Sequence, residues 1–300
     1  MMPQSPQDMW SQWLLKRRFG GDPQRMQAML DRLYPMRDKI LSRIQLDSSA
    51  RLLDVGCGDG LIAFGALEKF PAGYVIFSDI SDDLLQHARF LAEEMNAQDR
   101  CQFVHAAADD RSMFADELID AVTTRSVLIY VSAKQRAFDE FYRVLRSSDA
   151  VSGIPGGVLS IFEPINRFAY PEPPQRFDGY DVTPVVEIAD KVKALYECLQ
   201  PLDTDPMINF DERDLIAYAE RAGFTHIHLE LQSTIEPPDD ASWEAFIHIA
   251  ANPKVPTLAE AMPQALTPAE MEVFIHHLRP LVEAKQGQRR MALAYLWARK

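Results

Sequence analysis

Cysteine is scarce in this sequence, and its distribution excludes two kinds of protein. The 300 residues include three cysteines, Cys57, Cys101 and Cys198. An odd number at such wide spacing is neither a disulfide framework nor a zinc-binding pattern. We therefore expect a protein of a reducing compartment that holds no structural or catalytic metal ion.

The sequence also lacks a long apolar run and an excess of positive charge. No segment has the length that a membrane-spanning helix needs. Near the N-terminus the basic residues 16–18 follow the short apolar stretch, which is the reverse of a secretory signal. The formal net charge is −13, whereas general binding to nucleic acid needs clustered Lys and Arg. We expect a cytoplasmic monomer or homodimer that binds no nucleic acid and does not insert into a membrane.

Strand-like and helix-like apolar patterns alternate along most of the chain. Short apolar runs predict strands at 50–55, 74–79, 101–106, 118–125, 156–164, 225–234 and 290–300. Helical periodicity fills most of the intervals between them. This alternation predicts an α/β fold with a Rossmann-like, doubly wound sheet, mostly parallel with an antiparallel last strand.

Capping sequences and prolines mark where helices begin and where they are interrupted. Residues 132–135 and 267–270 have the spacing of capping boxes, and the second has proline at the first helical position. Ser81, followed by two acids, predicts a helix that runs to about Asn96. Residues 164–206 include seven prolines and predict long irregular loops.

The order of the predicted elements suggests how the chain is divided. Ligands bind at the carboxyl edge of an open parallel sheet, and the insertions at 164–208 and 234–289 follow strands that end there. We expect an N-terminal helical lid at 1–46 and one domain at 47–300. The two insertions of that domain are expected to form a cap over the acceptor.

A glycine-rich loop follows the first predicted strand, in the segment RLLDVGCGDG at 51–60. Its glycines are Gly56, Gly58 and Gly60. Such a loop lets a ligand approach bare backbone amides at a helix N-terminus. The dinucleotide fingerprint needs glycine where this chain has Leu61, and Asp54 and Asp59 would repel a pyrophosphate. The loop therefore favours a nucleotide-like ligand with positive charge.

The loop and the segments after it resemble the class I methyltransferases that use S-adenosylmethionine (SAM), in particular small-molecule enzymes like the ubiquinone/menaquinone methyltransferases. LLDVGCGDG is similar to the first motif of that family. Asp79, 19 residues after Gly60, is similar to the family's acid for the ribose hydroxyls. The likeness extends over about 40–163, 210–233 and the final strand, through LIDAVTTRSVLIYV, AFDEFYRVLR, PGGVLSIFEP and ERDLIAYAERAGFTHIHLEL.

The resemblance implies SAM as cofactor, held by residues at the ends of the first four strands. These are Asp54, Gly56, Cys57, Gly58 and Gly60; Asp79, Ile80 and Leu84; Ala108, Asp109 and Asp110; and Thr124, Arg125 and Ser126. Many relatives have an acid where this chain has alanine at 106–108, which leaves Asp109 or Asp110 for the adenine amino group. Arg125 is a candidate for the carboxylate of SAM or an acidic acceptor group, and a surface ion pair is the alternative.

Methyl transfer to oxygen or nitrogen usually needs a base. Glu163, which ends the fifth strand, and His248, on the second insertion, are the candidate catalytic residues. The alternatives are a strand-end acid that holds the loop at 164–166 and a histidine packed in the core. Aromatic residues predicted to line the acceptor pocket are Trp10, Tyr130, Tyr170, Tyr180, Trp243 and Phe246, although each also fits ordinary packing.

The function that these residues predict is SAM-dependent transfer of a methyl group to a small, apolar or aromatic acceptor at oxygen. C-methylation of a quinone-like or polyketide-like ring is the alternative, and a non-catalytic SAM-binding regulator is a candidate from another class. Leu61 argues against a nicotinamide oxidoreductase, and the net charge argues against a nucleic-acid acceptor. Arsenite methyltransferases need several cysteines near the acceptor, whereas Cys57 lies inside the glycine loop.

Overall fold

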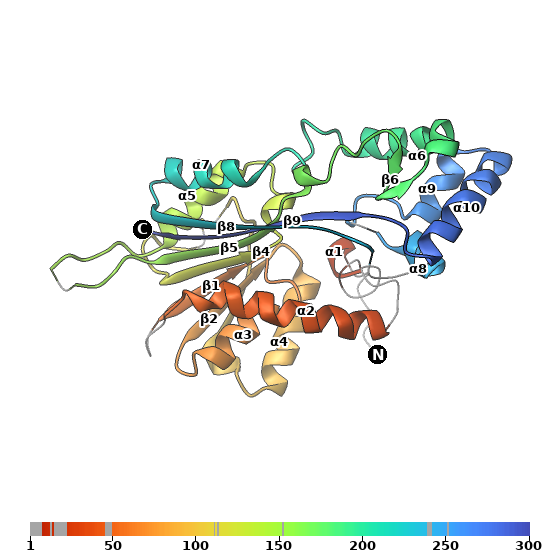
Figure 1. Ribbon diagram of the computed structural model, residues 1–300. Helices are drawn as coiled ribbons and strands as arrows, with labels where there is room; N and C mark the ends of the chain where they lie inside the picture. Colours follow the sequence, from red (N-terminus) through yellow and green to blue (C-terminus); the bar gives the residue numbers. More distant parts are fainter. Residues whose placement is uncertain are drawn as a thin grey trace.

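A seven-stranded sheet forms the centre of the computed structural model (Figure 1). The structure describes residues 8–12, 14, 23–45, 50–110, 112, 114–151, 153–238, 242–250 and 252–300. The strands are β1 (Arg51–Val55), β2 (Tyr74–Asp79), β3 (Cys101–His105), β4 (Ala121–Arg125), β5 (Val158–Pro164), β8 (Thr225–Glu236) and β9 (Arg289–Arg299). Their order is β3-β2-β1-β4-β5-β9-β8, and every neighbouring pair is parallel except the two that include β9. The predicted α/β sheet with an antiparallel last strand is confirmed.

Helices cover both faces of the sheet, as expected for parallel strands joined by crossovers. In Figure 1, α2 (Pro23–Ser42), α3 (Leu61–Lys69) and α4 (Asp82–Glu94) lie on one face, and α5 (Lys134–Val144) and α7 (Glu212–Ala222) lie on the other. Because side chains alternate along a strand, Ile161 and Phe162 of β5 enter different cores. The carboxyl ends of β1, β2, β4 and β5 meet at one edge, which α1 (Met9–Gln12) approaches (Figure 1).

The two predicted insertions come together in one helical subdomain, which we call the cap (Figure 1). It consists of β6 (Arg176–Phe177), β7 (Tyr180–Asp181), α6 (Val186–Leu199), α8 (Trp243–His248), α9 (Leu258–Ala265) and α10 (Pro268–Glu283). Buried side chains from both insertions, such as Phe177, Val192 and Phe274, form a core separate from those of the sheet. The prediction of irregular loops at 164–206 is wrong for α6, whose apolar face packs into this core.

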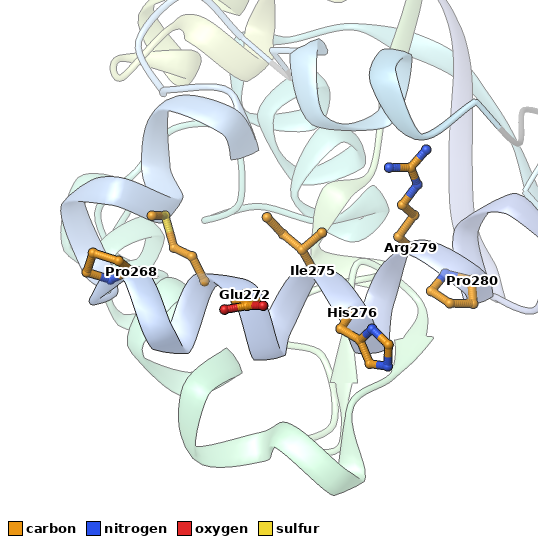
Figure 2. A pocket seen from close by; sticks show the side chains of 7 residues that line it. Pro268, Glu272, Ile275, His276, Arg279 and Pro280 are labelled. Carbon is orange, nitrogen blue, oxygen red and sulfur yellow. The ribbon is translucent and has the colours of Figure 1, made fainter.

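The outer surface of the cap has a shallow recess of about 550 Å³ along one face of α10 (Figure 2). Its lining residues are Pro268, Met271, Glu272, Ile275, His276, Arg279 and Pro280. All of them belong to α10, so the recess is a feature of that helix and not of the sheet edge. In the ranges that the structure describes, no helix is long and apolar enough to cross a membrane.

Candidate cofactor and acceptor site

The glycine loop between β1 and α3 has a backbone that only glycine adopts easily. The φ angles of Gly56, Gly58 and Gly60 are +63°, +55° and +85°, in the left-handed region that costs other residues free energy. A Cβ atom on Gly56 would also lie 2.3 Å from Cγ2 of Val127. The loop is therefore fixed both by its own dihedral angles and by the segment after β4.

Asp54, at the start of this loop, has a buried carboxylate with one oxygen unpartnered. Its Oδ1 accepts a hydrogen bond of 2.8 Å from Oγ1 of Thr123, whereas its Oδ2 has no hydrogen-bond partner in the described part of the chain. Burial raises the pKa of Asp54 to about 7, against the effects of the Thr123 hydroxyl, the charge of Arg125 and the nearby Ala63 amide, which lies outside hydrogen-bond geometry. Oδ1 of Asp59, in the same loop, is also buried without a partner. Buried acceptors of this kind need a donor, and a ligand ammonium would supply one.

Asp79 lies at the carboxyl end of β2, directly beside the loop. Its Oδ2 accepts from the Gly58 amide and its Oδ1 from the Ser81 amide, both at 2.9 Å. Burial raises the pKa of this carboxyl group as well. The next residue, Ile80, is an apolar side chain that is 46% exposed. A carboxylate beside an exposed apolar side chain suits a ribose and its attached base.

The other predicted cofactor residues divide into buried and accessible ones. Leu84 and Ala108 are buried, and Cys57 is buried with its pKa raised by burial, so its thiol is poorly reactive. Asp109 is partly accessible and Asp110 is exposed. Oδ1 of Asp110 accepts a hydrogen bond from the Ser112 amide at 3.2 Å, and the contact of either acid with the adenine amino group stays a prediction.

At the end of β4, three consecutive predicted residues have different environments. Thr124 is fully buried, and its hydroxyl has no described partner. Arg125 is partly buried and forms no ion pair with the residues that the structure describes, and its charge lowers the pKa of Asp54. Ser126 has a φ of +55°, and its amide donates to the Phe162 carbonyl at 2.9 Å. Arg125 thus places a positive charge near the glycine loop.

The N-terminal helix α1 is attached to the start of α4 through two aspartates. Oδ1 of Asp8 accepts from the amides of Trp10 and Ser11, and its Oδ2 accepts from the Ser81 hydroxyl at 2.6 Å. Oδ2 of Asp83 accepts from the Asp8 amide at 2.6 Å and from the Ser11 hydroxyl at 3.2 Å. We call this set of contacts the α1 latch.

The α1 latch brings apolar side chains to the cofactor site. The rings of Trp10 and Tyr130 meet edge to face with centroids 4.9 Å apart. A Cβ atom on Gly58 would lie 3.2 Å from Cδ2 of Leu14. Two residues predicted to line the acceptor pocket are thus in contact at the sheet edge. Trp13, which the sequence pattern placed on the same helix face, lies outside the described residues.

The aromatic residues of the cap are placed differently from the prediction. Tyr180 and Trp243 are 1% and 5% exposed, and Phe246 packs against both rings in the core of the cap. The prediction that Tyr180 and Trp243 line the acceptor pocket is therefore wrong, because packing of the cap buries them, whereas Phe246 is partly exposed and its role stays a prediction. Tyr170 remains 47% exposed.

Of the two candidate bases, Glu163 is inaccessible. It is 0% exposed, and its carboxylate accepts from the amides of residues 127–129. A base role for Glu163 is therefore wrong, and the alternative of a strand-end acid holds, although the segment it binds is 127–129 and not 164–166. His248 is exposed at the end of α8, with its Nδ1 2.7 Å from the Glu244 carbonyl. Its role as a base stays a prediction.

Several residues of the site had no distinguishing signal in the sequence. Thr123 supports Asp54, and Val127 packs on Gly56. Asp8 and Asp83 form the α1 latch with the predicted helix cap Ser81. Each is an ordinary residue type whose contact spans many positions of the chain, so only the folded structure reveals it.

The sheet order, the glycine loop and the acid after β2 together define a SAM-binding α/β fold. The residues fit that cofactor, because Asp54 leaves an acceptor for its ammonium and Asp79 lies where a ribose would meet the loop. In the described ranges no group of three His, Cys, Asp or Glu side chains could hold a metal ion.

Comparisons with known proteins agree with this class. A family model described as a methyltransferase domain matches residues 52–148. Geranyl diphosphate methyltransferase in complex with SAM has a similar structure, with a TM-score of 0.52 at 16% identity over 93% of this chain and 92% of that chain. At this identity the likeness concerns the fold alone. Residues 52–148 carry this methyltransferase domain, and the chain has the fold of the class I SAM-dependent methyltransferases.

Curated relatives match part of this chain only. The tRNA 5-carboxymethoxyuridine methyltransferase of Escherichia coli (strain K12) is 30% identical over 41% of this chain and 43% of its own length. The trans-aconitate 2-methyltransferase of Azoarcus sp. (strain BH72) is 30% identical over 52% of this chain and 53% of its own length. The ubiquinone/menaquinone C-methyltransferase of Rhodopseudomonas palustris (strain TIE-1) is 35% identical over 40% of this chain and 44% of its own length. The chain thus spans about half the length of the curated relatives it matches.

Proposed function

We propose that this protein transfers a methyl group from SAM to an oxygen atom of a small organic acceptor bound between the carboxyl edge of the sheet and the cap. The observation that carries the proposal is the pair of carboxylates at the glycine loop. Asp54 has a buried oxygen that no described residue hydrogen-bonds, and Asp79 lies at the end of the neighbouring strand.

Each part of the loop has a separate task in this proposal. Bound SAM supplies a methyl group on a sulfonium, which is reactive toward nucleophiles. Asp54 attracts the ammonium of the cofactor, and Asp79 accepts hydrogen bonds from the ribose hydroxyls. Trp10 and Tyr130 exclude water from the space above the loop, which protects the reaction. The remaining contribution is alignment of the acceptor.

The acceptor that this site favours carries a carboxylate. Arg125 has no ion-pair partner in the described part of the chain, and its guanidinium is suited to a carboxylate. A carboxylate oxygen has no proton to lose, so its methylation needs no base, in agreement with the engagement of Glu163 by backbone amides. Two relatives are named for carboxyl-bearing acceptors, 5-carboxymethoxyuridine and trans-aconitate.

A methyl-transfer assay with isotopically labelled SAM tests the reaction. Small carboxylic acids, phenols and quinone-like rings would be offered in parallel. We expect label in a methyl ester, which mild base releases as methanol. Label in a base-stable methyl on ring carbon would favour the competing C-methylation, to which the 35% identity to the C-methyltransferase of R. palustris points.

The role of Arg125 is tested with a variant and a matched control. Arg125→Gln should raise the KM for the acceptor by about tenfold or more, because a charged hydrogen bond is lost. If Arg125 instead holds the carboxylate of the cofactor, the KM for SAM rises and that for the acceptor does not. Arg136→Gln, on an exposed position of α5, should change neither value.

A further inference from the structure

The buried carboxylate of Glu163 connects β5 to both walls of the cofactor site. We propose that Glu163 is a positioning residue, which fixes the turn after β4 so that Val127 packs on the glycine loop and Tyr130 meets α1. This inference rests on the proposed cofactor site and adds a residue that controls its shape.

The first step is the anchor itself. Oε1 of Glu163 accepts from the amides of Val127 and Leu128 at 2.9 Å, and Oε2 accepts from Ile129 at 3.3 Å. These amides begin the short 3₁₀ helix Leu128–Tyr130, where backbone donors have no partner within the helix. Glu163 itself lies near the end of β5, where it is paired with Ala294 of β9. The anchor is therefore rigid on the side of the carboxylate.

The second step is the turn that the anchor stabilises. Ser126 connects β4 to the 3₁₀ helix with a φ of +55°, a conformation that is unfavourable for residues other than glycine. Surrounding contacts must hold such a turn, and the three hydrogen bonds to Glu163 follow it directly. Without these hydrogen bonds, the backbone at Ser126 would move toward a more favourable conformation.

The third step leads from the turn to the site. Val127 lies against Gly56, where a Cβ atom would come within 2.3 Å of its Cγ2. Tyr130, at the end of the same 3₁₀ helix, meets the ring of Trp10 on α1. One buried carboxylate thus fixes the position of Val127 against the glycine loop and the position of Tyr130 against α1.

The charge state of Glu163 affects this arrangement. Burial raises its pKa to about 7, and the three amides and the ammonium of Lys134 act in the opposite direction. Lys134 is the charged group from α5 that faces it, and that ammonium donates to the carbonyls of Val131 and Pro206. Below the pKa the carboxyl group is protonated and has one acceptor fewer for the amides.

The test compares binding of S-adenosylhomocysteine to the wild-type protein and to Glu163→Gln by calorimetry. At pH 8.5 the variant should bind about tenfold more weakly, because an acceptor for a buried amide becomes a donor. At pH 6 the two proteins should agree within about twofold, since the wild-type carboxyl group is then protonated too. Asp54 and Asp79 titrate in both proteins, and so does Lys134, whose pKa burial lowers to about 8. The ratio of the two dissociation constants therefore reports Glu163 together with the ammonium that faces it.

Glu172→Gln is the matched control. Its carboxylate also accepts two backbone amides, those of Asp178 and Gly179, but it does so in the cap. It should leave the dissociation constant within about twofold of the wild-type value at both pH values. If Glu163→Gln does not fold, Val127→Ala tests the same route and should also weaken binding.

Amide hydrogen exchange gives a readout without any ligand. Residues 127–129 and the glycine loop should exchange faster in Glu163→Gln and not in Glu172→Gln. Unchanged exchange there, or a ratio of dissociation constants that stays the same between pH 8.5 and pH 6, would overturn the inference. Failure of the wild-type protein to bind the ligand at all would instead overturn the proposed function on which the inference rests.

Discussion

At the scale of single residues, three buried carboxylates in one site have three environments. Asp54 keeps an oxygen with no hydrogen-bond partner among the described residues, Asp79 accepts from two amides, and Glu163 accepts from three. Burial raises the pKa of each. A carboxylate that accepts several amides stabilises structure, whereas an unpartnered one destabilises the empty protein and is suited to a ligand.

The roles of Asp54 and Asp79 can be separated with two ligands. Asp54→Asn should weaken S-adenosylhomocysteine by about tenfold or more, because its ammonium loses a charged partner. It should leave 5′-methylthioadenosine unchanged, since that ligand has a ribose but no amino-acid portion. Asp79→Asn should weaken both. Calorimetric dissociation constants check this, and equal effects of Asp54→Asn on both ligands would contradict the assignment.

The sequence was sufficient for residues whose role depends on local backbone or spacing. Gly56, Gly58 and Gly60 form the predicted loop after the first strand, with positive φ angles, and Asp79 lies beside them at the end of β2. It was insufficient for Tyr180 and Trp243, because burial in a core depends on which distant helices pack there. The partners of Glu163 lie about 35 positions earlier in the chain, and no local pattern reports them.

At the scale of elements, a capping sequence predicted the start of a helix correctly where no tertiary contact fixes that start. The predicted box at Thr267 and Glu270 is formed at the start of α10. The predicted box at 132–135 is not, because α5 begins at Lys134 after Ala133 without a side-chain cap. Here the chain enters from the 3₁₀ helix that Glu163 anchors, so tertiary contacts fix the start of the helix.

The α1 latch gives a prediction at this scale. Asp8→Ala removes three acceptor contacts of Asp8 and should detach α1 from α4. We expect the affinity for S-adenosylhomocysteine to fall about fivefold, with little change in melting temperature, because α1 contributes little to the main cores. The control is Asp82→Ala, next to Asp83 on α4, which removes an exposed contact to His105 of β3. Equal effects of the two variants would contradict a role for the latch.

At the scale of the whole molecule, the cap has a core of its own and should be separable from cofactor binding. Phe274 is fully buried there and meets Phe177 edge to face. Phe274→Ala should destabilise the cap by about 3–5 kcal/mol. Calorimetric unfolding should show an earlier transition, while affinity for S-adenosylhomocysteine persists and methylation of the acceptor is lost. Loss of cofactor affinity would show that the cap is part of that site.

The pH dependence of the stability of the ligand-free protein follows from the raised carboxyl pKa values. For Asp54 and Glu163 the native state holds a proton up to about pH 7, whereas the unfolded chain releases it near pH 4. The native state therefore binds more protons in this window, and the free energy of unfolding rises as pH falls from 8 to 5.5. Melting temperatures at constant ionic strength should be higher at pH 5.5 than at pH 8.

The most direct test of the account is a calorimetric titration of the wild-type protein and Asp79→Ala with S-adenosylhomocysteine and with NADH. The account predicts micromolar binding of S-adenosylhomocysteine to the wild-type protein, its loss in the variant, and no binding of NADH. Tight NADH binding, or equal binding of S-adenosylhomocysteine to both proteins, would contradict the assignment of the glycine loop and Asp79 to SAM.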